Sequence, residues 1–266
     1  DSCLISEIKS IYMDEDTFCL LDRGGAGIFI FTSTGKLVNQ INYFGQAPHE
    51  FTDITAFTID PHLNQICIWD VGSRSIKKYT YKGEFVKTYR TDVLIRELAT
   101  FQNEINLFIL PFYSKECPYS IWIEDLNNQV VKDFDYPKPK DDQFEFVNTY
   151  CNKEANSSYY YDRNYDQLLY ITSDTLQTVY SIELTQRLSN DLRIKDPSSF
   201  KWENFAMMWN FSISPKYLLM NYYYYEQEKP YKWVLLNRNT NDIKIANNMI
   251  NNMDSVQAET QSIFFL

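Results

Sequence analysis

The sequence predicts an all-β protein in which a unit of four strands repeats along the chain. Short apolar segments bounded by Gly, Asn, Pro and Ser predict strands, and no apolar period of 3.6 residues lies between them. The first hundred residues also repeat at one offset, because Asp22 returns as Asp70 and Gly35 returns as Gly83, each 48 residues later. Four short strands in a period of this size are typical of the blades of a β-propeller.

The first period contains four predicted strands, at residues 17–21, 28–32, 37–42 and 54–60. Gly35 lies in a tight hairpin turn between the second and third of these strands, where it supplies a positive φ. A linker at 44–51 leads to the fourth strand. A further strand is predicted at 5–13, and no earlier strand is available to pair with it.

The rest of the chain repeats this plan less strictly. Predicted strands at 105–110, 120–124 and 129–134 form a third set, those at 168–172 and 178–183 a fourth, and those at 217–225, 232–236 and 243–246 a fifth. We therefore expect a single propeller domain over residues 1–266, with six blades of which five are recognisable. The blade that joins the two ends is expected to be incomplete, made from residues 255–266 or lying partly outside this sequence.

Turn chemistry changes along the chain. All seven glycines lie within the first 83 residues, whereas Asn occurs at later predicted turns, for example at 127–128 and 237–241. Asn tolerates the left-handed backbone conformation better than most residues that carry a side chain. The sequence therefore predicts that later blades use Asn where the first two blades use Gly.

Composition excludes several classes of function. The formal net charge of −10 argues against binding of nucleic acid, since that binding depends on Lys and Arg neutralising phosphates. The two histidines, His49 and His62, are too few for a metal site with three His ligands. Five cysteines without a Cys-x-x-Cys spacing argue against zinc, and we expect most of them to be small buried side chains. No apolar run is long enough for a membrane span.

The segment 44–85 resembles the NHL-type propeller repeat, on matches that include Asp70 and Arg74. The linker Gly-Gln-Ala-Pro-His-Glu-Phe at 45–51 looks like the Gly-x-Gly-Pro-x-Glu-aromatic linker of a family of six-bladed β-propellers, with Ala47 in place of the second Gly. That family is frequent among exported proteins and lipoproteins of gut anaerobic bacteria. The resemblance implies the fold and an exported location, in the periplasm or at the outer cell surface, with lipid anchoring through a removed N-terminal leader as one option. It does not imply one activity.

A polar ligand site is predicted on one face of the propeller, near its central channel. The linker before each blade and the turn between its two middle strands lie on this face. It would present the side chains of Arg23, Gln46, His49, Glu50 and Arg74. The competing interpretation is turn chemistry, in which Asp22 and Asp70 bond nearby backbone groups and Arg74 pairs with a neighbouring carboxylate.

The tyrosine runs at 159–161 and 222–225 also have two interpretations. Both faces of a propeller blade pack against neighbouring blades, and tall amphipathic side chains fill the gap between them. Alternatively, the rings form an exposed platform for a sugar, to which Trp202, Trp209 and Trp233 would contribute.

These observations predict a non-catalytic, exported β-propeller that binds a ligand or an envelope protein, with carbohydrate as the preferred ligand class. One alternative is a metal-dependent hydrolase or lyase acting at the propeller channel, so enzymatic activity is left open. A second alternative is a structural scaffold of an envelope assembly. No cofactor, metal ligand or catalytic residue is assigned. Calcium is the minor option, because it needs several converging oxygens and the sequence contains no EF-hand or glycine-aspartate repeat.

Overall fold

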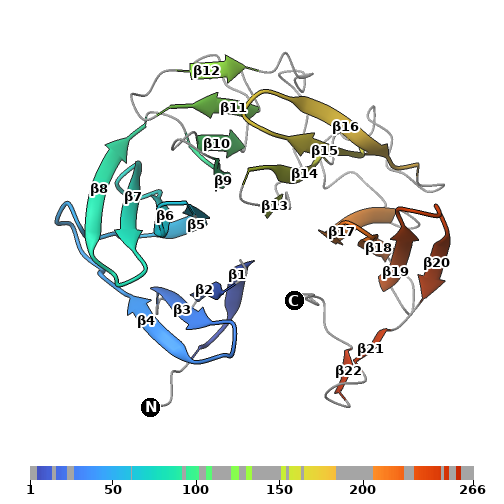
Figure 1. The fold of residues 1–266 in the computed structure, drawn as a ribbon, viewed down its shortest axis with the longest axis horizontal. Helices are drawn as coiled ribbons and strands as arrows, with labels where there is room; N and C mark the ends of the chain where they lie inside the picture. Colours follow the sequence, from blue (N-terminus) through green and yellow to red (C-terminus); the bar gives the residue numbers. More distant parts are fainter. Residues whose placement is uncertain are drawn as a thin grey trace, which may run out of the picture. The chain divides into compact units, whose positions relative to one another are not determined.

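The computed structural model consists of β-strands and the turns that connect them, with no helix among the residues that it describes (Figure 1). The described residues are 5–13, 16–22, 27–60, 62–91, 94–101, 106–109, 121–125, 130–133, 151–153, 156–162, 165–183, 206–224, 231–246, 249–251 and 256–258. In this part of the chain there is accordingly no helix long and apolar enough to cross a membrane.

Five sheets of four strands follow one another along the described chain (Figure 1). The first contains β1 (Ile8–Met13), β2 (Thr17–Asp22), β3 (Gly27–Thr32) and β4 (Leu37–Ile41), and the second contains β5 (Ile54–Asp60), β6 (Gln65–Asp70), β7 (Ser75–Thr80) and β8 (Phe85–Arg90). The third contains β9 (Glu97–Thr100), β10 (Asn106–Ile109), β11 (Ile121–Glu124) and β12 (Val130–Asp133), and the fourth contains β13 (Cys151–Lys153), β14 (Ser158–Asp162), β15 (Gln167–Ile171) and β16 (Leu176–Ser181). The fifth contains β17 (Ala206–Ile213), β18 (Tyr217–Tyr224), β19 (Tyr231–Asn237) and β20 (Ile243–Ala246), and a two-stranded sheet contains β21 (Met249–Asn251) and β22 (Val256–Ala258).

Each four-stranded sheet keeps the chain order, so that every strand pairs with the strand before it. Repeated four-stranded meanders of this kind are propeller blades, and the predicted fold class, an all-β propeller, is therefore confirmed. By their contacts the strands form two compact units. β1–β12 belong to the first unit, β17–β22 belong to the second, and β13–β16 have residues in both.

The blades begin at different residues from those that the predicted period suggests. The strand predicted at 5–13 is not left over, because β1 pairs antiparallel with β2 and completes the first sheet. The strand at 54–60, predicted as the fourth of the first period, is β5 and opens the second sheet by pairing with β6. A repeat offset gives the length of a unit but not the residue at which it starts. Five further strands, β9, β13, β14, β17 and β21, have no counterpart among the predicted strands.

The first two sheets share an apolar core. Its completely buried members are Cys19, Ile28, Ile30, Ile41, Phe51, Ile59, Ile66, Ile68 and Tyr79. Successive side chains of a strand point to opposite faces, so Phe29 forms a separate cluster on the other face of the first sheet. Likewise, Trp69 of the second sheet packs against Leu98 of the third. Both faces of these blades are therefore apolar, as blade stacking requires. The cores also contain Cys19 and Cys67 as buried free thiols, which agrees with the prediction for these two, while the side chains of Cys3, Cys117 and Cys151 lie outside the described residues.

The second unit buries four of the tyrosines that the sequence presents as runs, Tyr159–Tyr161 and Tyr222, and leaves Tyr223 and Tyr224 half-buried. Tyr159, Tyr160 and Tyr161 are 8%, 6% and 0% exposed. Tyr222 of β18 and Met208 of β17 lie in the same apolar core as Tyr161. The packing interpretation is confirmed for these tyrosines, and Trp233 is buried as well. The side chains of Trp202, Trp209 and Tyr225 lie outside the described residues.

The hairpin turns show the predicted change from Gly to Asn. Gly35 and Gly83 occupy equivalent positions in the β3–β4 and β7–β8 turns, with φ of 83° and 81°. In the β19–β20 turn of the fifth sheet, Asn241 adopts a φ of 60°. The replacement is therefore confirmed at this turn. The β15–β16 turn is built differently, since no residue in it has a positive φ, and residues 127–128 lie outside the described part of the chain.

Gly83→Ala is expected to destabilise the protein more than Gly35→Ala. Both substitutions place a side chain at a positive φ, which costs about 1–2 kcal/mol. At Gly83 the new Cβ would also stand 2.6 Å from Asn39 Nδ2 of the first sheet, whereas nothing lies within 4 Å of it at Gly35. Urea denaturation of both variants measures the difference, and adding Asn39→Ala should reduce it. Equal losses for the two glycines would show that this contact between the sheets has no energetic effect.

Candidate functional site

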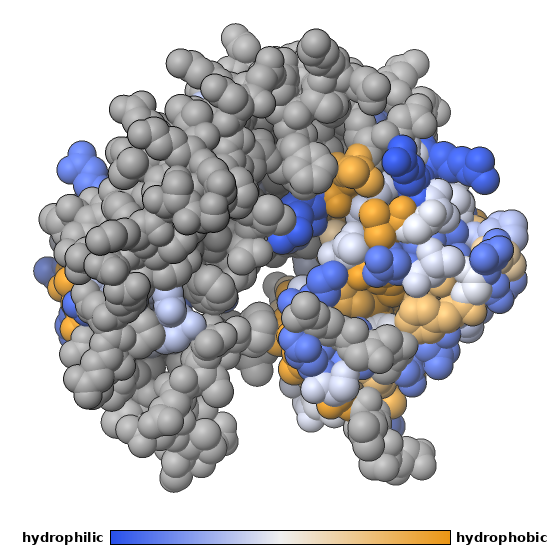
Figure 2. All heavy atoms as spheres, turned by 180° about the vertical axis from the view of Figure 1, so that it is seen from behind, coloured by the Kyte–Doolittle hydropathy of each residue, from blue (hydrophilic) through white to orange (hydrophobic). Residues whose placement is uncertain are grey.

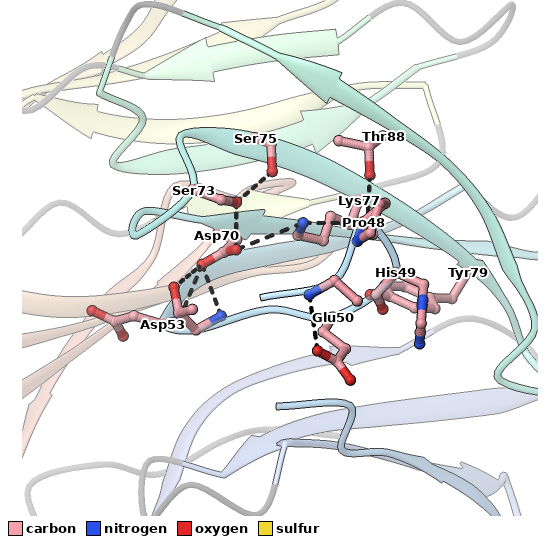
Figure 3. A network of polar contacts seen from close by, with 12 residues as sticks. Pro48, His49, Glu50, Asp53, Asp70, Ser73, Ser75, Lys77, Tyr79 and Thr88 are labelled. Carbon is pink, nitrogen blue, oxygen red and sulfur yellow. Dashed lines mark hydrogen bonds and ion pairs between the residues drawn. The ribbon is translucent and has the colours of Figure 1, made fainter. Parts of the chain in front are cut away.

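A buried carboxylate organises the face on which the polar site is predicted (Figure 3). Asp70 is the last residue of β6, and it is completely buried. Its Oδ1 accepts hydrogen bonds from the backbone N–H of Thr52 at 3.2 Å, from the Thr52 hydroxyl at 3.0 Å and from the backbone N–H of Asp53 at 3.0 Å. Asp70 therefore ties the end of β6 to the residues that lead into β5.

The other oxygen of Asp70 faces a buried lysine. Ser73 Oγ donates to Asp70 Oδ2 at 2.5 Å, and Lys77 Nζ lies 3.8 Å from the same oxygen. Burial would raise the pKa of Asp70, but the hydrogen bonds from Ser73, Asp53 and Thr52 outweigh burial and hold its pKa below the usual value. Burial lowers the pKa of Lys77, while the charge of Asp70 acts in the opposite direction.

The same pattern of hydrogen bonds to a buried aspartate occurs 48 residues earlier, in the first sheet. Asp22, at the end of β2, accepts hydrogen bonds at Oδ1 from the backbone N–H of Ser6 at 3.1 Å, from the Ser6 hydroxyl at 2.8 Å and from the backbone N–H of Glu7 at 2.9 Å. Asp162 ends the second strand of the fourth sheet and is also buried. The turn-chemistry interpretation of Asp22 and Asp70 is therefore confirmed, and these carboxylates are structural.

The linker between the first two blades is closed by its own carboxylate. Glu50 Oε2 accepts a hydrogen bond from the backbone N–H of Ala47 at 2.9 Å, and the Glu50 N–H donates to the Ala47 carbonyl at 2.8 Å. The Gly45 N–H donates to the Phe51 carbonyl at 3.0 Å. A Cβ at Gly45 would stand 1.9 Å from Glu50 Oε2, so any other residue there would displace the carboxylate that closes the loop.

Side chains of the second blade hold the linker from the other side (Figure 3). The hydroxyl of the buried Tyr79 donates to the His49 carbonyl at 2.7 Å. The Pro48 carbonyl accepts from Lys77 Nζ at 3.4 Å and from Thr88 Oγ1 at 3.1 Å. Burial raises the pKa of Tyr79, and the charge of Asp70 adds to this effect, so its hydroxyl remains a donor at neutral pH.

The structure separates the predicted site residues. Gln46 and His49 have exposed side chains on the clamped linker, and Glu50 is half-buried in the same loop. Arg74 is exposed in the β6–β7 turn. β7 leads from this turn to two of the residues that hold the linker, so about 10 Å of strand separates Arg74 from Lys77 and about 16 Å separates it from Tyr79. Arg23 lies outside the described residues.

Arg74 has an unusual backbone conformation, with a φ of 48°. Its carbonyl accepts a hydrogen bond from the Thr91 N–H at 3.2 Å, which joins the turn to the residue after β8. No described carboxylate forms an ion pair with Arg74. The structure thus brings Gln46, His49 and Glu50 together in one loop and leaves Arg74 apart. Ligand binding by any of these residues stays a prediction.

Exposed aromatic residues surround the linker and have no counterpart among the predicted site residues. Tyr43, Phe44 and Phe85 are 38%, 45% and 39% exposed. Figure 2 shows one face of the molecule, on which apolar residues are exposed among hydrophilic ones. The available sequence signal is the pair Tyr43-Phe44 directly before the Gly45 linker motif, together with Phe85 two residues after the Gly83 turn.

No group of three or more His, Cys, Asp or Glu side chains that could hold a metal ion occurs in the part of the chain that the structure describes.

A buried row of polar residues crosses the third sheet, where Asn106 lies opposite both Thr100 and Glu124. The Thr100 hydroxyl donates to Asn106 Oδ1 at 3.2 Å. Burial raises the pKa of Glu124 to about 7, and the charge of Asp125 adds to this shift.

Residues 1–264 match the family described as Domain of unknown function (DUF4934), and the chain belongs to this family. No curated protein matches the chain. A structure described as "Putative exported protein" from Bacteroides fragilis NCTC 9343 is similar with a TM-score of 0.76 and 16% identity, over 92% of this chain and 72% of that one. A DUF4221 family member from Bacteroides vulgatus ATCC 8482 is similar with a TM-score of 0.58 and 13% identity, over 90% and 80% of the two chains. At these identities, both similarities concern the fold alone.

Asp70→Asn is expected to destabilise the protein by about 3 kcal/mol at pH 7, because it leaves the Lys77 ammonium buried without its carboxylate. Asp53→Asn is the matched control, since the Asp53 side chain is exposed and only its backbone N–H bonds Asp70. Urea denaturation measures both. The double variant Asp70→Asn with Lys77→Met should recover part of the loss, whereas equal effects of Asp70→Asn and Asp53→Asn would contradict a structural role for the buried pair.

Glu124→Gln is expected to stabilise the protein at pH 8 and to have little effect at pH 5. The pKa of Glu124 is raised to about 7 in the folded protein, so ionisation of the buried carboxyl lowers stability as the pH rises through 7. The rise of the Glu124 pKa from 4.5 to about 7 corresponds to about 3 kcal/mol at about 1.4 kcal/mol per pKa unit, and solvent screening reduces the expected gain at pH 8 to about 2 kcal/mol. Denaturation curves at the two pH values test this, and an equal effect at both would exclude ionisation as the cause.

Proposed function

We propose that this protein is a non-catalytic β-propeller of the cell envelope that binds a ligand or a protein partner through the linker at 44–51. The proposal rests on the difference between the backbone of this loop and its side chains. Its backbone is fixed by buried groups of the second blade, while the side chains of Gln46 and His49 are exposed. A loop held in this way loses little conformational entropy on binding, which favours recognition.

The hydrogen bonds of the linker support binding over catalysis. The carboxylate nearest to His49 in the sequence is Glu50, and it already accepts a hydrogen bond within its own loop. The hydroxyl of Tyr79 is likewise engaged by the His49 carbonyl. A catalytic triad would need a carboxylate that orients the His49 imidazole and a hydroxyl that the imidazole deprotonates, whereas these two groups are bonded to the backbone of the linker. The exposed groups of the linker are therefore assigned to recognition, with carbohydrate as the preferred ligand class.

Export to the periplasm or to the outer cell surface is part of this proposal. The resemblance of the linker motif to exported propellers supports it, as does the description of the similar Bacteroides fragilis protein as exported. Fractionation of cells that produce the full natural protein tests the location. Recovery of the protein only with the cytoplasm would contradict it.

Capture of envelope components tests the binding function. We expect immobilised protein to retain specific protein or polysaccharide from a Bacteroides fragilis envelope extract, and a Gln46→Ala/His49→Ala variant to retain at least fivefold less. Both side chains are exposed, so the variant should keep its fold. Thr34→Ala, which changes an exposed residue of the β3–β4 turn, is the control. The proposal fails if the double variant and the wild type retain the same material in equal amounts.

A further inference from the structure

Four exposed ring side chains lie around the linker and form what we call the aromatic surface. They are Tyr43 and Phe44 at the start of the linker, His49 within it and Phe85 at the beginning of β8. The three aromatic residues are among the large hydrophobic side chains that remain more than one third exposed. All four belong to the first compact unit, so their relative positions are defined.

Two completely buried rings support this surface. Tyr79 lies with its ring centroid 6.0 Å from that of Tyr43 and 5.8 Å from that of Phe85. Phe51 lies 4.7 Å from Phe44 and 6.4 Å from Tyr79. Three of these contacts are edge-to-face, an arrangement that aromatic pairs prefer, and the Tyr43–Tyr79 contact is tilted at 36°. The exposed rings are thus held in place by the core, and their orientation does not have to be established when a ligand binds.

Neutral hydrogen-bonding groups accompany the rings. The Asn39 amide and the Tyr43 hydroxyl lie next to Gly83, since a Cβ there would stand 2.6 Å from Asn39 Nδ2 and 3.1 Å from the Tyr43 oxygen. Gln46 adds an exposed amide. Two exposed residues of opposite charge, Lys82 and Glu84, flank Gly83, and the half-buried carboxylate of Glu50 accepts a hydrogen bond from the Ala47 N–H. The surface therefore offers ring faces and neutral amides together with charges of both signs.

We propose that the aromatic surface binds a neutral carbohydrate chain, an inference that rests on the binding function proposed above. A sugar ring has an apolar C–H face that packs on an aromatic ring and hydroxyl groups that bond to amides. Two of the exposed rings, those of His49 and Phe85, lie with their centroids 6.3 Å apart and their planes at 62° to each other. A chain of sugar units, whose rings also differ in orientation, can contact both of these planes at once.

Affinity electrophoresis with neutral polysaccharides tests this inference. The probes are amylopectin, laminarin, galactomannan, arabinoxylan and dextran, each cast in a native gel. We expect at least one to retard the wild-type protein, and Phe44→Ala with Phe85→Ala to weaken the retardation at least tenfold. Val38→Ala is the control, because Val38 is 53% exposed but is not part of the aromatic surface. Phe44→Tyr with Phe85→Tyr keeps the rings and should restore binding.

Three results would overturn the inference. They are the absence of retardation by every polysaccharide, equal retardation of the Phe44→Ala/Phe85→Ala variant and the wild type, and an equal loss with Val38→Ala. Because Phe85 contacts the buried Tyr79, Phe44→Ala alone is the second variant if the double variant unfolds, and it should still weaken binding. If only protein is captured from the envelope extract, and the capture depends on Gln46 and His49, the carbohydrate inference fails while the binding function stands.

Discussion

The first two blades depend on the hydrogen bonds of one buried aspartate each, which lies at the end of the second strand of the sheet. Asp22 and Asp70 each accept hydrogen bonds from two backbone N–H groups and one hydroxyl of the two residues immediately before the first strand of their sheet. A carboxylate buried without such donors would be strongly destabilising, so the donors compensate for its desolvation. The result is a fixed geometry at one end of each sheet, where the chain passes from one blade to the next.

In the second blade, contacts lead from the buried Asp70 through β7 to the linker at the surface. Asp70 faces Lys77, which donates to the linker at the Pro48 carbonyl, and Tyr79 of the same strand donates to His49. Tyr79 also supports the exposed rings of the aromatic surface. Buried polar groups and buried rings thus hold one loop from beneath. Because the backbone is held by buried groups, the exposed side chains of the linker keep a fixed position, which suits recognition. This is the physical basis of the proposed function.

The repeat made much of the fold predictable, but the site only in part. The offset between Asp22 and Asp70 indicated both the blade and the structural role of these carboxylates. It could not indicate where a blade begins, because the offset is the same whichever strand is taken as the first of the four. The burial of Tyr159–161 followed from the two apolar faces of a blade. The exposure of Tyr43, Phe44 and Phe85 did not follow, since it depends on how the linker folds over Tyr79. The separation of Arg74 from His49 depends on the path of the linker along β7, which a motif does not encode.

Residue-resolved hydrogen exchange tests the role of the buried aspartates most directly. The amides of Thr52 and Asp53 donate to Asp70, and those of Ser6 and Glu7 donate to Asp22, although all four residues lie outside the strands. We predict that these four amides exchange as slowly as amides within β5 and β6, and that Asp70→Asn accelerates exchange at Thr52 and Asp53 more than at Ser6, Glu7 or the strand amides. Exchange of the four wild-type amides at the rate of an unstructured loop would contradict the account.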